Sequence, residues 1–290
     1  LFLPCRPRVT LPPPVPSALP EVAAISAIAA ALDACGGRAC RFDVDVLAEC
    51  DSTNTRLMAR AEAGAPSGTV IVAGQQTAGR GRRGRVWLSA PGDTLMFSLL
   101  WRFPRATPLG GLSLVAGLAV TDALVQLGYT EARLKWPNDI LLGTRKLAGV
   151  LTELVSGISA TGGGTAAVIG IGLNRHLPAG LPDSLREQVA ALDGVALPLP
   201  SSAQLLATLL VALQTRLEVF ARQGFSAMRA DWCARHAFED RPVRLFGDEG
   251  PPLEGICRGV DGEGVLLLET PAGLQRILSG ELGPSLRPAT

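Results

Sequence analysis

The chain has 290 residues and a formal net charge of +1, and 47% of its residues are hydrophobic while 18% are charged. This near-neutral balance argues against the broad basic surface of a general nucleic-acid-binding protein, and the chain contains no run of about 18 uninterrupted apolar residues of the kind that spans a membrane. The six cysteines are dispersed and the two histidines lie far apart. We therefore expect no zinc site, and we expect reduced thiols in a cytoplasmic protein.

Predicted strands and helices alternate through most of the chain. Residues 1–20 hold seven prolines and are expected to form a disordered leader. Helical periodicity predicts helices at residues 21–34, 56–63, 112–127, 201–222 and 224–235. Runs rich in apolar and β-branched residues predict strands at residues 42–47, 69–73, 94–101, 133–136, 140–142, 147–155 and 168–174.

From residue 241 the pattern changes to short strands separated by turns, at residues 243–246, 253–260, 265–269 and 274–278. This pattern predicts a small β-barrel. We therefore expect a larger domain at residues 21–237 and the barrel at residues 238–290. The expected fold class is α+β, with a mixed or antiparallel sheet that carries helices on one face. A doubly wound α/β sheet stays open as an alternative, because strands and helices alternate.

Residues 74–87, which we call the Arg–Gly loop, follow a predicted buried strand and lack its apolar character. Its second half interleaves the four arginines Arg80, Arg82, Arg83 and Arg85 with the glycines Gly79, Gly81 and Gly84. Glycine lets the backbone come close to a ligand, and the guanidinium fork matches the oxygens of phosphate or carboxylate. The loop is therefore predicted to close over an anion.

The spacing Gly79-x-Gly81-x-x-Gly84 also matches a dinucleotide-binding fingerprint. That fingerprint requires a helix directly after the glycines and an acidic residue about 20 positions later. Here the turn residues Pro91 and Gly92 follow, and no acid stands at that distance. We reject this interpretation, and contact with a nucleic-acid backbone remains an alternative.

A second informative stretch, residues 134–153, contains both lysines of the chain, Lys135 and Lys146. Pro137 restricts the backbone and makes Asn138 and Asp139 a rigid corner. The asparagine can hydrogen-bond a sugar or phosphate, and the aspartate can hold a metal or accept a proton. Lys146 at the start of the next strand can reach an anion as a compact point charge.

The Arg–Gly loop and residues 134–153 together make the chain resemble the biotin–protein ligases, which are also called biotin–[acetyl-CoA-carboxylase] ligases. Five motifs carry the resemblance, in the order in which that family has them: Asp51-Ser-Thr-Asn54, Gln76-Thr-Ala-Gly-Arg-Gly-Arg-Arg-Gly-Arg85, Lys135-Trp-Pro-Asn-Asp139, Arg145-Lys-Leu-Ala-Gly149 and Gly170-Ile-Gly-Leu-Asn174. Each motif alone is weak, and the ordered set is specific.

The resemblance implies a class II synthetase-like fold with an SH3-like C-terminal barrel, in which residues 21–237 form the catalytic biotin/ATP-binding domain. It also implies a two-step reaction. The carboxylate of biotin attacks the α-phosphate of ATP to give biotinyl-5′-AMP and pyrophosphate, with Mg²⁺ as the counter-ion of ATP. A lysine of a biotin carboxyl carrier protein then takes the biotinyl group and releases AMP. The alternative is a lipoate or octanoate–protein ligase, whose Arg-Arg-x-Ser-Gly-Gly-Gly segment is absent from this chain.

The resemblance also implies roles for individual residues. It assigns biotin binding to Ser52, Thr53, Asn54, Gln76, Arg80, Gly81, Arg82, Lys146 and Gly149. It assigns ATP binding to Arg82, Arg85, Lys135, Asn138 and Asn174. The catalytic residues would be Lys146 as the main electrostatic catalyst, Arg82, and Asp139 as a proton acceptor or a ligand of the metal. Ser52–Asn54 could instead be a simple helix N-cap, and Trp87 and Trp136 are interpreted as core residues.

Some members of that family carry an N-terminal helix-turn-helix. Only the proline-rich stretch and one short helix precede Phe42, so we expect a form without this element and without DNA binding. The oligomeric state stays open, a homodimer included. In the family's C-terminal motif this chain has Gly283 and Pro284 inserted, which leaves open whether Arg287 reaches the nucleotide.

Overall fold

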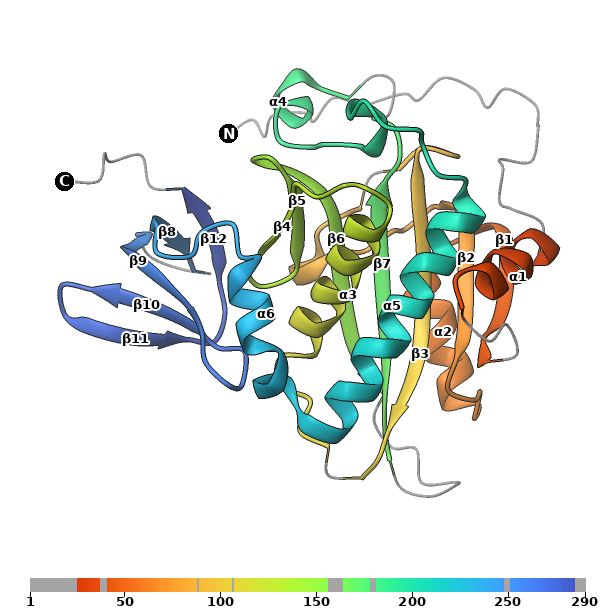
Figure 1. Ribbon diagram of the computed structural model, residues 1–290, viewed down its shortest axis with the longest axis horizontal. Coiled ribbons are helices and arrows are strands. Elements are labelled where there is room, and N and C mark those ends of the chain that lie inside the picture. The colour runs from red at the N-terminus through yellow and green to blue at the C-terminus, as the bar shows by residue number, and fades with distance from the viewer. Residues whose placement is uncertain are drawn as a thin grey trace, which may run out of the picture.

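Figure 1 shows a computed structural model of the chain, which describes residues 25–36, 41–87, 89–105, 107–155, 164–177, 181–247 and 251–284. The predicted leader, the first residues of the helix predicted at 21–34 and Arg287 lie outside the described residues.

A seven-stranded mixed sheet forms the larger part of the molecule, with the strand order β1-β2-β3-β7-β6-β5-β4. Its strands are β1 (Asp43–Cys50), β2 (Thr69–Gln76), β3 (Thr94–Phe103), β4 (Ala132–Lys135), β5 (Asp139–Leu142), β6 (Arg145–Val155) and β7 (Thr165–Asn174). Only the β1–β2 pair is parallel among these strands. The predicted α+β class is therefore confirmed, and the doubly wound alternative is wrong. The cause lies in the run from β4 to β7, whose connections form antiparallel hairpins rather than helical crossovers.

Helices cover both faces of this sheet (Figure 1). The helices α1 (Ile25–Ala34), α3 (Leu112–Gln126) and α5 (Ser202–Gln223) enclose the larger core, whereas α2 (Thr53–Glu62) covers the opposite face. Strand alternation produces this division, because Val70 and Val72 point into the larger core and Ile71 packs with Leu57 of α2. The expectation of helices on one face therefore needs correction for α2.

Helix α5 is long and apolar enough to cross a membrane by length and composition alone. In the structure it packs against α3 and α1, and its leucines belong to the larger core. Its apolar composition is therefore accounted for by burial inside the protein.

Short elements complete this part of the chain. They are η2 (Arg82–Gly84), α4 (Asp183–Arg186), η3 (Leu192–Gly194), η4 (Phe225–Met228) and α6 (Arg229–Ala234). The helix predicted at residues 224–235 is thus two elements, because the chain passes from a 3-10 turn to an α-helix at Met228.

The C-terminal part is a five-stranded antiparallel sheet with the order β11-β10-β9-β8-β12. Its strands are β8 (Pro242–Phe246), β9 (Leu253–Val260), β10 (Leu266–Thr270), β11 (Gly273–Ile277) and β12 (Glu281–Pro284). The sequence analysis missed β12, because Gly283 and Pro284 resemble a turn. They instead extend an edge strand opposite β8, a place that tolerates proline. Closure into a barrel stays a prediction.

The two sheets share one hydrophobic core, to which Cys257 and Leu266 of the C-terminal sheet belong. The chain just before β8 also extends the larger sheet. The Leu134 amide donates to the Arg235 carbonyl at 2.8 Å, and the Ala237 amide donates to the Leu134 carbonyl at 2.8 Å. The C-terminal sheet is thereby attached beside β4, next to the Pro137 corner.

Candidate active site

One cleft on the α2 face of the larger sheet brings the predicted site residues together. It encloses about 960 Å³ of space, including its open mouth. All predicted site residues except Lys135 and Asn174 line it: Ser52, Thr53, Asn54, Gln76, Arg80, Gly81, Arg82, Arg85, Asn138, Asp139, Lys146 and Gly149.

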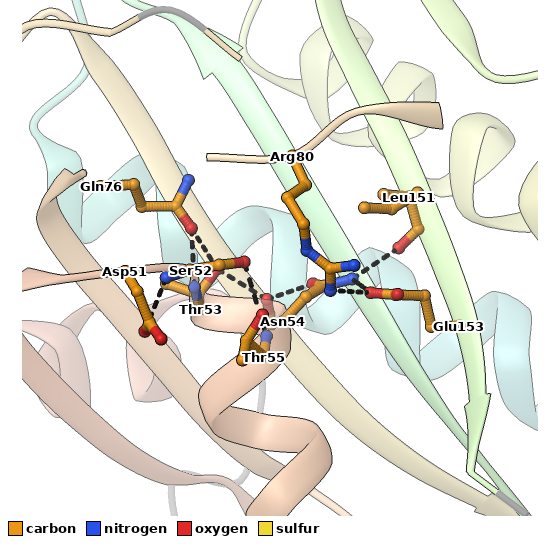
Figure 2. Close-up of polar contacts among 10 residues, drawn as sticks. Asp51, Ser52, Thr53, Asn54, Thr55, Gln76, Arg80, Leu151 and Glu153 are labelled. Atoms are coloured by element: carbon orange, nitrogen blue, oxygen red, sulfur yellow. Dashed lines mark hydrogen bonds and ion pairs between the residues drawn. The ribbon is translucent and has the colours of Figure 1, made fainter. Parts of the chain in front are cut away.

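At one end of the cleft lie four neutral polar residues that we call the polar floor, namely Thr53, Asn54, Gln76 and Ser98. The Thr53 amide and hydroxyl donate to Gln76 Oε1 at 2.7 and 3.1 Å. The buried Ser98 hydroxyl lies 2.7 Å from Thr53 Oγ1 and 2.5 Å from Asn54 Oδ1. Figure 2 shows Gln76, Thr53 and Asn54 joined in this network at the start of α2. Because the partners are protein groups, the floor is held in place before any ligand binds.

Ser52 is both a helix cap and a cleft residue. Its hydroxyl accepts a hydrogen bond from the Thr55 amide at 3.5 Å and caps α2, and its side chain lines the cleft. The simple N-cap interpretation and the binding interpretation are therefore compatible.

The other end of the cleft carries a group of cations that we call the cationic rim, namely Arg82, Arg85 and Lys146. Lys146 Nζ lies 2.6 Å from Asp139 Oδ1 and 5.4 Å from the centroid of the Trp87 ring. Arg82 Nη1 donates to Asn138 Oδ1 at 3.5 Å.

The C-terminal sheet supplies an acidic partner to this rim. Glu281 of β12 forms an ion pair with Arg85, and its Oε1 lies 3.9 Å from Lys135 Nζ. The hydrogen bond from Arg85 lowers the pKa of the Glu281 carboxyl. Burial, together with the neighbouring Arg83, lowers the pKa of Arg82. Cations are thus crowded at this end, which favours an incoming anion.

Comparison with known proteins identifies relatives of this chain. The chain matches the Biotin/lipoate A/B protein ligase family over residues 46–174 and the Biotin protein ligase C terminal domain over residues 240–282. It is 39% identical to the bifunctional ligase/repressor BirA of Salmonella typhimurium over 249 residues, which are 85% of this chain and 75% of that protein. The chain belongs to the biotin protein ligase family.

Two further relatives support this assignment. This ligase is 36% identical to the biotin–[acetyl-CoA-carboxylase] ligase of Paracoccus denitrificans, over 82% of this chain and 98% of that protein. The biotin protein ligase of Aquifex aeolicus in complex with biotin and ATP is 30% identical, with a TM-score of 0.70 over 83% of this chain and 97% of that one.

Glycines of this ligase make room for the cleft on β6 and β7. A Cβ atom at Gly170 would lie 2.2 Å from Asn54 Oδ1, and one at Gly172 would lie 2.6 Å from the Trp87 ring. Gly149 pairs with Gly172 across the strands and also faces that ring. The Trp87 ring therefore lies against a part of the sheet that has no side chains, and it lines the cleft. Its interpretation as a core residue is wrong. Trp136 is buried as expected.

Two predicted residues do not line the cleft. Lys135 stands behind the rim, near Glu281. The Asn174 side-chain amide donates to the Ala190 carbonyl at 3.0 Å, and the Ala190 amide donates to the Lys146 carbonyl at 2.8 Å. In this structure Asn174 supports the strand that carries Lys146, and its contact with the nucleotide stays a prediction.

Three site residues had no role in the sequence analysis: Ser98, Glu153 and Glu281. Ser98 could have been noticed as a polar residue inside the otherwise apolar stretch that became β3. Glu153 and Glu281 stand within or beside motifs that were already singled out, but nothing in their local sequence shows which arginine each one contacts.

The cleft offers a limited set of metal ligands. Within the described parts of the chain, no group of three or more His, Cys, Asp and Glu side chains is arranged to hold a metal ion. Asp139 and Asn138 present oxygens beside the rim. This set fits Mg²⁺ that arrives with ATP, because Mg²⁺ is commonly held by one or two carboxylates together with phosphates and water.

Proposed function

We propose that this ligase activates biotin with ATP to biotinyl-5′-AMP and transfers the biotinyl group to a lysine of a biotin carboxyl carrier protein. The observation that carries the proposal is the arrangement of the cleft, in which a buried neutral floor meets a crowded cationic rim. Biotin has the same two characters, a neutral ureido ring and a carboxylate at the end of an aliphatic chain. The Aquifex aeolicus relative, bound to biotin and ATP, supports the pairing of these ligands.

The polar floor and the start of the Arg–Gly loop would hold biotin. Ser52, Thr53 and Gln76 supply hydroxyl and amide groups that can pair with both the N–H groups and the carbonyl of a ureido ring. Asn54 completes the floor, and the backbone around Arg80 and Gly81 covers it. A buried polar site of this kind discriminates strongly against a ligand that leaves its groups unpaired.

The cationic rim would carry the first chemical step. One oxygen of the biotin carboxylate attacks the α-phosphorus, the new P–O bond forms, and the bond to pyrophosphate breaks. Lys146 and Arg82 offset the repulsion between the two anions and the negative charge that grows in the transition state. Arg85 and Asn138 would orient the nucleotide.

Asp139 has two proposed roles. It would hold Mg²⁺ together with Asn138, and the ion would supply positive charge to the ATP phosphates. In the second step the ε-amine of the carrier lysine attacks the carbonyl of the mixed anhydride, and AMP leaves. Asp139 would accept the proton that the amine loses, since it lies beside Lys146 at the reacting end of the cleft.

The acceptor is proposed from the chemistry and from the relatives. Two of them are named biotin–[acetyl-CoA-carboxylase] ligases, and a carboxylase carrier domain offers the lysine that the second step needs. The repressor activity in the name of other relatives is not part of this proposal.

The test is exchange of labelled pyrophosphate into ATP, measured with biotin, with lipoate and with neither acid. Exchange that requires biotin supports the proposal, and later transfer of labelled biotin to a carrier domain completes it. Exchange with lipoate alone would keep the adenylation chemistry and change the substrate. A folded protein that exchanges with neither acid would contradict the proposal.

A further inference from the structure

Glu153 of β6 lies outside the cleft wall but contacts both a floor residue and the Arg–Gly loop. Its Oε2 accepts a hydrogen bond from Asn54 Nδ2 at 2.8 Å and forms an ion pair with Arg80 Nη2 at 2.9 Å. Figure 2 shows the Arg80 side chain reaching from the loop towards this carboxylate, and the Asn54 amide reaching it from α2. One oxygen atom thus joins two parts of the site that are 26 positions apart in the chain.

The first contact determines how Asn54 is oriented. Asn54 is 3% exposed, and Nδ2 also donates to the Leu151 carbonyl at 3.3 Å. Its Oδ1 accepts from Ser98 at 2.5 Å and lies so close to Gly170 that a Cβ atom there would come within 2.2 Å of it. Because a carboxylate only accepts hydrogen bonds, Glu153 requires the NH₂ group on its side and the oxygen on the side of the floor.

The second contact, between Glu153 and Arg80, holds the Arg–Gly loop against β6. The loop is internally hydrogen-bonded, since the Gly81 amide donates to the Arg85 carbonyl at 2.7 Å and the Trp87 amide donates to the Gly79 carbonyl at 2.9 Å. These hydrogen bonds connect the residues on either side of Arg80 to the segment that carries Arg85. The Arg80–Glu153 ion pair therefore acts on the whole loop, including the part that carries the rim arginines.

From these contacts we infer that Glu153 is a positioning residue that couples biotin recognition to closure of the Arg–Gly loop. The carboxylate that orients the floor amide also holds the loop over it, so the two arrangements stabilise each other. The inference rests on the proposed function for the identity of the ligand. It does not require Glu153 to touch biotin or ATP.

Glu153 lies far from Lys146, the proposed electrostatic catalyst. It stands seven residues along β6 from Lys146, which is roughly 23 Å in an extended strand. Loss of its charge should therefore release ligands faster and leave the adenylation step itself almost unchanged. A change in biotin dissociation without a change in kcat distinguishes a positioning role of Glu153 from a general loss of structure.

The test compares Glu153→Gln with wild type by stopped-flow measurement of biotin dissociation and by pyrophosphate exchange. The neutral variant keeps the size of the side chain and loses the charge. We expect the dissociation rate and the KM for biotin to rise about tenfold, the size expected when a charge-assisted hydrogen bond is replaced by a neutral one. The kcat at saturating biotin should stay within about twofold. Glu269→Gln is the matched control, because it removes a carboxylate paired with Arg258 at 2.6 Å on the C-terminal sheet.

A double-mutant cycle with Arg80→Gln tests the coupling directly. If the ion pair holds the loop, the two substitutions together should weaken biotin binding hardly more than Glu153→Gln alone, because Arg80 then has no charged partner left to lose. Effects that simply add, or a Glu153→Gln variant that behaves like the Glu269→Gln control, would overturn the inference. So would a parallel loss of kcat and of thermal stability. If the inference is overturned but the wild type still exchanges pyrophosphate with biotin, the proposed function stands. If the wild type does not exchange, that result contradicts the proposed function and says nothing about Glu153.

Discussion

The two ends of the cleft are built in opposite ways. The polar floor is neutral and mostly buried, with only Gln76 half-buried, and it rests on the start of α2 and on β2 and β3 of the large sheet. The cationic rim is charged and more exposed, and it lies on the Arg–Gly loop and at the start of β6. Recognition of a neutral ring requires hydrogen-bonding groups that are fixed in place. A reaction between two anions requires cationic side chains that can move with the substrate. The sheet provides the first and the loop provides the second.

The ends also differ in how their own groups are satisfied. Floor side chains find hydrogen-bond partners among one another. Rim cations outnumber the nearby carboxylates, Asp139 and Glu281, among the residues that line the cleft. The difference predicts that floor substitutions change affinity for biotin, while rim substitutions change the rate of reaction.

The largest expected effect comes from Lys146→Ala at the rim. Loss of one fixed donor to a developing anion costs about a hundredfold or more in rate, so pyrophosphate exchange should fall by at least that factor. Affinity for biotin, measured by calorimetry, should fall by less than about tenfold. Arg145→Ala is the control, because Arg145 is the exposed neighbour of Lys146. Equal losses of affinity and rate would show that Lys146 belongs to ground-state binding instead.

At the floor, Gly170→Ala should produce the next largest effect. The added Cβ meets Asn54 Oδ1 at 2.2 Å, so the buried amide must move and lose its hydrogen bonds, a loss of about 2 kcal/mol. Biotin affinity should fall about thirtyfold, while the ATP concentration for half-maximal exchange stays nearly constant. Gly194→Ala, where a Cβ meets nothing within 4 Å, should change neither quantity. A variant with normal biotin affinity would disprove the role of this close contact.

A smaller effect is expected from a group away from both ends. His236 lies between α6 and the C-terminal sheet, and burial lowers its pKa below the usual 6.5. As the pH falls, His236 is therefore protonated in the unfolded chain before it is protonated in the folded one. The free energy of unfolding decreases below about pH 6.5 and stops decreasing below the folded-state pKa. The limiting slope is about 1.4 kcal/mol per pH unit. Urea unfolding of wild type and His236→Phe at pH 7.5 and 5.5 should show this loss in wild type and a weaker one in the variant.

The smallest effect is expected for the ion pair that joins the loop to the C-terminal sheet. Arg85 lowers the pKa of Glu281 below 4.5, so the stabilisation is present above about pH 4.5 and disappears as the pH falls through the lower folded-state value. Glu281→Gln should reduce the unfolding free energy at pH 7 by less than about 1 kcal/mol, because the pair is partly exposed. The difference from wild type should shrink at pH 3.5. A difference that stays constant across this range would assign it to packing instead of charge.

The sequence by itself determined the kinds of most elements and most residues of the site. Hydrophobic periodicity placed the long elements within a few residues, because burial of one face imposes its repeat on the local sequence. The motifs at residues 51–54, 76–85 and 135–149 pointed to the cleft, because each combines residue types with a restricted backbone and a specific charge. Local sequence carries this part of the information, whereas Ser98, Glu153, Glu281 and strand β12 were missed.

Only the tertiary structure decided which groups meet. Glu153 and Arg80 are far apart in the chain, as are Glu281 and Arg85, and their contacts depend on the register of several strands at once. The place of α2 on the second face, the fifth strand opposite β8 and the position of Trp87 over Gly149 and Gly172 have the same origin. Strand pairing and packing are non-local, so a residue's neighbours across the sheet cannot be read from its neighbours along the chain.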